Sequence, residues 1–189
     1  MNFSENLPLK YFMSKDDAIL ILENGETYKG TGIGKKGETI GELCFNTSMT
    51  GYQEIITDPS YADQIINFTF PHIGITGTNN IDNESIAPVA KGIIVKNTLT
   101  SPSNFRSNLN LNEWLCKNNV IGIQGIDTRS ITNLIRSNGY LNAIIINGNI
   151  NKIKISKYLK KISLWKGLEG KDLASKVSCK IPCKKLPYS

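Results

Sequence analysis

The fold of this chain is organised around Phe45-Asn46-Thr47-Ser48-Met49-Thr50-Gly51-Tyr52-Gln53-Glu54-Ile55-Ile56-Thr57-Asp58-Pro59-Ser60-Tyr61. Small hydroxyl side chains, two tyrosines and two residues that interrupt regular structure, Gly51 and Pro59, lie close together in this segment. This density of hydrogen-bond donors and acceptors is higher than a simple connector needs. We therefore expect the segment to hold a functional site.

The segment is expected to connect two strands, at residues 39–45 and 64–70, through a short helix. Thr50 and Gln53 have the spacing of a capping box, in which each side chain bonds to the backbone of the other residue. Asp58-Pro59 should end this helix, because proline lacks an N–H group and disfavours helical angles at the residue before it.

Turns are expected on the N-terminal side of this segment. Asn24-Gly25, between two apolar runs, predicts a β-hairpin with a type I′ turn, which begins the domain at residue 18. Gly32, Gly34 and Gly37 have the spacing of a dinucleotide-binding fingerprint, but a strand follows them rather than a helix. Because no helix N-terminus would face a pyrophosphate, we interpret this motif as a turn.

Strands and helices alternate in the rest of the domain. Asn110 and Asp127 have the positions of N-caps, and Gly139 that of a helix end, which predicts helices at residues 110–118 and 128–137. Strands are expected at residues 91–96, 120–124 and 141–147. Short strands followed by a strand–helix–strand unit predict a mixed α and β domain over residues 18–149.

The composition is that of a globular protein, with 40% hydrophobic and 20% charged residues. No apolar run approaches the length that spans a bilayer, so no membrane association is expected. Residues 1–17 are polar and unpatterned, and we predict a disordered N-terminal extension there. This segment has no secretory core, which indicates a cytoplasmic protein.

The net charge of +6 comes from the end of the chain. Residues 1–149 carry 11 Lys and Arg against 14 Asp and Glu, whereas residues 150–189 carry 11 Lys against 2 acids. Phosphate-binding surfaces usually use arginine as well, which argues against a nucleic-acid partner. Residues 151–163 have helical apolar spacing among their lysines, typical of a connector helix packed on the domain or of a membrane-surface helix; we favour the connector.

The four cysteines and the single histidine give no recognisable nucleophile or metal site. Cys44 lies in an apolar strand and Cys116 on a helix, so both are expected to be buried reduced thiols. Cys179 and Cys183 lack further ligands for a metal. His72 could be a general base, but without a partner a structural hydrogen bond is favoured.

Five motifs, at residues 45–54, 57–61, 71–74, 103–106 and 126–129, occur in an order that resembles a known family. They read Phe-Asn-Thr-Ser-Met-Thr-Gly-Tyr-Gln-Glu, Thr-Asp-Pro-Ser-Tyr, Pro-His-Ile-Gly, Ser-Asn-Phe-Arg and Ile-Asp-Thr-Arg. They resemble the N-terminal domain of the small, glutamine-using subunit of carbamoyl phosphate synthase. The resemblance covers roughly residues 18 to 175, so residues 150–189 are expected to form a basic connector helix and a truncated linker to the glutamine amidotransferase domain.

This resemblance implies a three-layer β/β/α swivelling fold and a role in a heterodimeric ligase. The domain would dock on the large subunit, which makes carbamoyl phosphate from glutamine-derived ammonia, bicarbonate and ATP for arginine and pyrimidine synthesis. ATP and Mg²⁺ would be used by the large subunit, and no cofactor is expected on this chain. The resemblance also implies that Ser48 contacts glutamine, whereas a hydroxyl in a turn can equally bond to local backbone.

Further polar residues at motif positions are candidates for structural hydrogen bonds, interface contacts or substrate contacts. An arginine at an interface could pair bidentately with a partner carboxylate. The candidates are Asn46, Tyr52, Asp58, Tyr61, His72, Asn104, Arg106, Asp127 and Arg129.

Catalysis by this chain alone is not expected. In the family, a cysteine on a tight elbow flanked by small residues attacks glutamine, with a histidine and a glutamate as its partners. None of the four cysteines here has small residues on both sides, and His72 is not followed two residues later by Glu. A non-catalytic docking or structural module is therefore an alternative function, and nucleic-acid binding through the lysine-rich tail is a weaker one.

Overall fold

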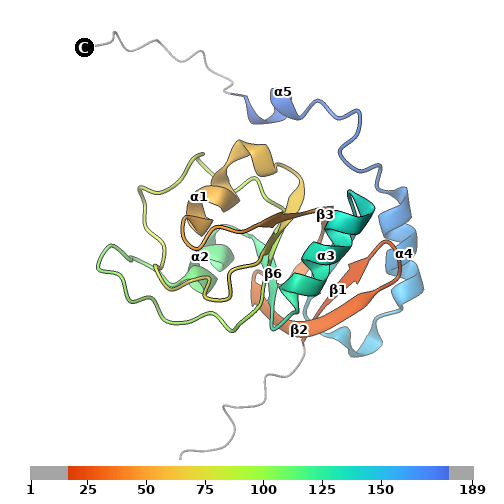
Figure 1. Cartoon of the computed structure of the whole chain (residues 1–189), viewed down its shortest axis with the longest axis horizontal. Coiled ribbons are helices and arrows are strands. Elements are labelled where there is room, and N and C mark those ends of the chain that lie inside the picture. The colour runs from red at the N-terminus through yellow and green to blue at the C-terminus, as the bar shows by residue number, and fades with distance from the viewer. Residues whose placement is uncertain (1–16, 179–189) are drawn as a thin grey trace, which may run out of the picture.

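Seven strands close into a barrel in the computed structural model, which describes residues 17–178 (Figure 1). The strands are Ala18–Leu22 (β1), Thr27–Gly34 (β2), Gly37–Asn46 (β3), Gln64–Phe68 (β4), Gly92–Val95 (β5), Ile121–Gln124 (β6) and Asn142–Asn147 (β7). The helices are Tyr52–Thr57 (α1), Leu111–Lys117 (α2), Thr128–Asn138 (α3), Ile155–Leu164 (α4) and Leu173–Val177 (α5), with 3₁₀ turns at Pro59–Tyr61 (η2) and Ile150–Lys152 (η3). The predicted mixed α and β class is confirmed.

The barrel closes through β7, which pairs antiparallel with both β1 and β3. Asn147 is opposite Ala18 on one side and Gly37 on the other. The strands β3, β4, β5 and β6 run parallel to one another, so the chain must cross over between them. The crossovers carry α1, α2 and the long loops, which places the polar segments outside the barrel.

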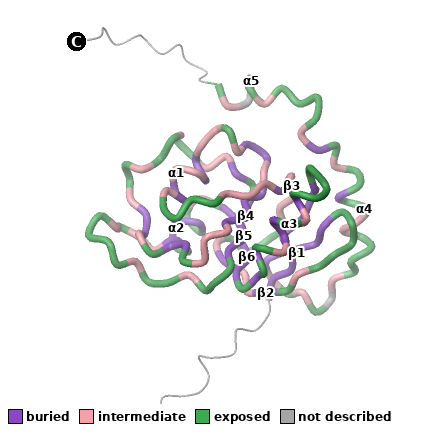
Figure 2. The backbone as a smooth tube through the Cα atoms, in the orientation of Figure 1, coloured by how far each residue is buried: buried purple, intermediate pink, exposed green. Residues whose placement is uncertain are grey.

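Strand β1 is buried on both faces, which explains its uninterrupted apolar sequence. Because side chains alternate across a strand, Leu20 belongs to the core cluster that includes Ile131 of α3. Ile19 and Ile21 belong to another cluster, with Ile162 of α4. Figure 2 shows this buried backbone at the centre of the molecule.

The helices α1 and α2 share a third core cluster with β2, β4 and β5. Tyr52 and Ile56 of α1 lie in it with Phe68 of β4, and Leu111 and Leu115 represent α2. With only six residues, α1 would be marginally stable in isolation. Apolar packing against the barrel therefore fixes its position.

Of the two turns predicted near the N-terminal side of the domain, one is confirmed and the other has a different type. Gly32 and Gly34 lie at the end of β2, and Lys35 and Lys36 make the short connection to Gly37 at the start of β3. The motif therefore precedes a strand and not a helix, as predicted. The predicted type I′ turn is wrong, because Gly25 has a positive φ of 91° but Asn24 does not. Instead, the Leu22 N–H group donates to the Glu26 carbonyl at 2.9 Å, which makes a longer loop.

The predicted helix caps are found in the structure. Asn110 accepts a hydrogen bond from the Glu113 N–H group, and Asp127 accepts from the N–H groups of Arg129 and Ser130. Gly139 ends α3 with a φ of 84°. The strands and helices expected after residue 63 all form, with ends that differ from the prediction by at most four residues.

The lysine-rich helix α4 packs on the barrel. Ile162 is buried, and Ile153, Tyr158 and Leu159 pack against the cluster formed by β1 and β7. Its lysines remain exposed, which agrees with the connector interpretation rather than with a membrane-surface helix. Among residues 17–178, no helix is long and apolar enough to cross a membrane. Nearly all of the predicted N-terminal extension, and residues 179–189 with Cys179 and Cys183, lie outside the described residues.

A close contact between Gly32 on β2 and Asn147 on β7 supports the closure of the barrel. A Cβ atom at position 32 would lie 1.9 Å from Asn147 Oδ1. The Asn147 side chain is buried, and its Nδ2 donates to the carbonyls of Ile33 and Lys35 at 3.0 and 3.1 Å. Room for an extra methyl group therefore requires the loss of these two hydrogen bonds.

We expect Gly32→Ala to lower the free energy of unfolding by about 2 kcal/mol, because the displaced Asn147 loses its buried partners. Urea denaturation measures this change. Asn147→Ala removes the clashing atoms, so the double variant should lose less stability than the sum of the two single variants. Fully additive losses would contradict the contact.

Candidate functional site

The turn between β3 and α1 presents the Ser48 hydroxyl to solvent. Ser48 is exposed, and its N–H group donates to Asn46 Oδ1 at 2.8 Å, as in an Asx turn. No hydrogen bond within residues 17–178 uses the Ser48 hydroxyl. The backbone of Ser48 is therefore held while its side chain keeps its donor and acceptor capacity.

Asn46 connects this turn to two neighbouring segments. Its Nδ2 donates to the Tyr61 hydroxyl at 3.0 Å. Its carbonyl accepts hydrogen bonds from Thr69 N and Thr69 Oγ1 at 3.0 and 3.2 Å. Asn46 and Tyr61, both predicted from the motifs, thus tie the turn to η2 and to the end of β4.

Tyr52, the next predicted residue, is buried and bonds to other residues of the domain. It is 1% exposed, and its hydroxyl donates to the Gly77 carbonyl at 2.7 Å and accepts from Thr76 Oγ1 at 2.8 Å. Burial raises the pKa of Tyr52 above its ordinary value. The neutral phenol therefore holds the loop that begins at Thr76 against α1.

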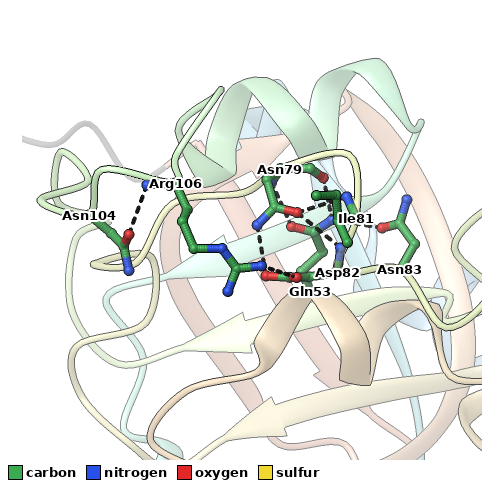
Figure 3. A network of polar contacts seen from close by, with 7 residues as sticks. All are labelled: Gln53, Asn79, Ile81, Asp82, Asn83, Asn104 and Arg106. Carbon is green, nitrogen blue, oxygen red and sulfur yellow. Dashed lines mark hydrogen bonds and ion pairs between the residues drawn. The ribbon is translucent and has the colours of Figure 1, made fainter.

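Gln53 also holds this loop, because its side-chain amide bonds to both backbone groups of Asn79, as a neighbouring strand would (Figure 3). Its Oε1 accepts from Asn79 N at 2.9 Å, while its Nε2 donates to the Asn79 carbonyl at 2.6 Å and to Asn83 Oδ1 at 2.7 Å. The predicted capping box of Thr50 and Gln53 is wrong, since Gly51, at a φ of 77°, is the N-cap and no side chain caps α1. The amide of Gln53 is used for the loop instead.

An ion pair closes the same network from the opposite loop (Figure 3). Arg106 Nη2 lies 2.7 Å from Asp82 Oδ1, and Asp82 Oδ2 accepts from Asn79 Nδ2 at 2.7 Å. Asn104 Oδ1 accepts from the Arg106 N–H group at 2.9 Å. Asn104 and Arg106, both predicted as polar motif residues, thus bond within the chain and order two loops.

These side chains line a polar cavity of about 330 Å³ beside α1. It lies between the start of α1 and the loops at residues 76–82 and 104–106. Ser48 does not line it, although Thr50 and Gly51 of the same turn do. The part of this turn at residues 46–48 is called the serine turn below. The lining residues are Thr50, Gly51, Tyr52, Gln53, Glu54, Thr76, Gly77, Asn79, Asp82, Asn104 and Arg106.

The remaining predicted residues lie away from this cavity lining. His72 is exposed and its ring meets Phe70 edge-on, with centroids 5.8 Å apart. Asp58 accepts from Ser60 N at 2.8 Å and caps η2, and Asp127 caps α3. Arg129 is exposed on the first turn of α3. None of these four residues lines the cavity, and no hydrogen bond among the described residues joins one of them to Ser48.

Comparison with known proteins now identifies the family. A sequence model described as "Carbamoyl-phosphate synthase small chain, CPSase domain" matches residues 20–145. The chain belongs to this family. Curated relatives named carbamoyl phosphate synthase small chain include one from Bradyrhizobium diazoefficiens, 46% identical over 168 residues, and one from Bartonella henselae, 48% identical over 177 residues.

The chain spans less than half the length of these carbamoyl phosphate synthase small chains. The match covers 87% of this chain and 42% of the Bradyrhizobium relative, and 92% of this chain and 44% of the Bartonella henselae relative. A third relative, from Bartonella quintana, is 49% identical with the same coverage as the second.

Sequence reasoning missed the residues that organise the cavity in this small-chain domain. Asn79 and Asp82 lie in a polar loop without periodicity, and Gln53 was assigned to a helix cap. The clustering of Asn and Asp after residue 78 was the available signal, because such side chains often bond to backbone in turns. Their partner Arg106, however, is 24 residues away from Asp82.

The described cysteines and acidic residues form no metal-binding cluster, and burial keeps the Cys44 thiol protonated. Among residues 17–178, no three His, Cys, Asp or Glu side chains gather as metal ligands. Cys44 is half-buried, its thiol donates to the Ile65 carbonyl at 3.8 Å, and burial raises its pKa to about 12. The predicted burial of Cys116 is wrong, because this residue lies on the exposed face of α2.

We expect iodoacetamide at pH 8 to modify Cys116 at least about 100-fold faster than Cys44, because only thiolates react and Cys44 stays protonated. Mass spectrometry of peptides from a Cys179→Ser, Cys183→Ser variant measures both rates. In urea the two rates should converge. Equal rates in the folded protein would contradict the burial of the Cys44 thiol.

Proposed function

We propose that this chain forms the N-terminal part of the small subunit of a glutamine-dependent carbamoyl phosphate synthase. In this function it docks on the large subunit and completes the glutamine site of a longer small chain. Family membership over residues 20–145 and the similarity to small chains from several bacteria support the proposal. The glutaminase chemistry would come from the part of the relatives that this chain does not match.

The exposed Ser48 hydroxyl is the observation that carries the role in glutamine binding. The turn is fixed by Asn46, whereas the hydroxyl itself is not used within the described chain. A fixed hydroxyl can donate to the carboxylate or carbonyl of glutamine and accept from its amide or ammonium group. Because the backbone is already ordered, little conformational entropy is lost on binding.

The other partners and cofactors follow from the same proposal. The large subunit would use ATP, Mg²⁺ and bicarbonate, and the product would serve arginine and pyrimidine synthesis in the cytoplasm. The finer description of the fold, a three-layer β/β/α swivelling domain, is also part of the proposal. Opposite sides of the closed barrel would be its two β layers, and the helices would form the third.

We expect the 189-residue chain to form a heterodimer with the large subunit of the enzyme. Sedimentation velocity of the mixture should show a species heavier than either protein alone at micromolar concentration. Two separate boundaries at all concentrations would contradict docking by this domain.

We expect Ser48→Ala to lower kcat/KM for glutamine by about tenfold, because one hydrogen bond to the substrate is lost. The variant is made in this chain joined to the remaining sequence of the Bartonella henselae relative and paired with the large subunit. Ammonia-dependent synthesis should stay within about twofold, because ammonia bypasses the glutamine site.

Ser60→Ala is the matched control, since Ser60 is exposed and caps nothing with its side chain. It should leave glutamine use unchanged. If the domain were only a docking module, Ser48→Ala would behave like Ser60→Ala.

A further inference from the structure

The segment that follows α4 returns to the barrel and packs on its end. This return segment is defined as residues 165–171. With Glu42, Tyr140 and Asn142 of the barrel end, its residues 165–169 line a cavity of about 370 Å³. Gly167 is buried in it, with a φ of 67°. The return segment thus has a defined path although it is neither helix nor strand.

Asp63 provides a charged anchor for this path. It is 6% exposed and has a positive φ of 62°, which few residues other than glycine adopt. One carboxylate oxygen lies 3.1 Å from Lys91 Nζ, and the other lies 3.9 Å from Lys171 Nζ in the return segment. A buried carboxylate requires such compensation, so both lysines are held near it.

Two further contacts restrain the return segment. The Lys171 ammonium group lies 4.4 Å from the centre of the Trp165 ring, which connects the two ends of the segment. The Leu168 backbone amide faces the carboxylate of Glu42 on β3. Burial raises the pKa of Glu42, and this amide partly opposes the increase.

These contacts lie on the same strand and loop as the serine turn. Glu42 is on β3, which ends at Asn46, the residue that fixes Ser48. Asp63 lies two residues after Tyr61, which bonds to Asn46, and its carbonyl accepts from Glu42 N at 3.4 Å. The return segment and the serine turn are therefore both attached to β3 and to the loop at residues 61–63.

We propose that Asp63 is a positioning residue, which fixes the path of the return segment relative to the Ser48 turn through Lys171. The functional consequence of this positioning rests on the proposed function. In that function, the residues after the return segment would hold the glutaminase part against Ser48. The physical claim itself concerns only the described chain. Its test is therefore independent of any activity.

The experiment measures the distance between the serine turn and α5, the helix that follows the return segment. Nitroxide labels at Thr47→Cys and Ala174→Cys, both exposed positions, report it in a background with Cys116, Cys179 and Cys183 replaced by Ser. We expect Asp63→Asn and Lys171→Met each to widen the distance distribution at least about twofold. Asn tolerates the positive φ, so Asp63→Asn should keep the fold.

Hydrogen exchange gives a second measurement. The Leu168 amide should exchange about tenfold faster in both variants, while amides of β1 and β7 keep their protection. Glu169→Gln is the matched control, because it removes an exposed acid from the same segment. It should change neither the distance distribution nor the exchange rate.

Three outcomes would overturn the proposal: an unchanged distance distribution in both variants, unchanged Leu168 exchange, or equal effects of Glu169→Gln. A failed association with the large subunit would overturn the proposed function and leave these measurements valid. In the extended chain, an unchanged KM for glutamine in Asp63→Asn would show that the return segment does not position the glutaminase part.

Discussion

Closure of the barrel at β7 is the constraint on which the rest of the structure depends. This strand supplies hydrogen bonds to both β1 and β3, and all its residues are buried. Ile145 lies in the cluster with α3, whereas Ile144 and Ile146 lie in the cluster with α4. One strand thus serves two ladders and two cores, so its middle residues are apolar and its polar side chains, Asn142 and Asn147, lie at its ends. The functional groups are displaced to the crossovers.

The crossovers keep their shape through buried polar side chains rather than regular structure. The loops at residues 75–90 and 98–109 contain little more than one isolated bridge, between Thr78 and Leu109. Tyr52 and Gln53 of α1 supply the hydrogen bonds that a neighbouring strand would otherwise supply. Because each buried acceptor would be costly to leave unpaired, these contacts restrict the loops strongly. The result is a rigid polar surface around a short helix.

Strand β3 connects the parts relevant to function in this small-chain domain. Its end fixes the turn that exposes Ser48, and Glu42 on the same strand lines one cavity with the return segment. In the proposed function, this domain would contribute to catalysis by holding a substrate-binding hydroxyl at a defined distance from other polypeptide. The family assignment and this geometry support the same function.

The sequence by itself determined the local elements and the family. Short apolar runs specify strands, and Asn110, Asp127 and Gly139 specify helix ends. Both signals act through contacts within a few residues, so they could be read correctly. Only the tertiary structure decided that the strands close through β7, that Gln53 bonds to a loop instead of capping α1, and that Cys116 is exposed. Those outcomes depend on partners distant in sequence, and propensity and spacing carry no information about such partners.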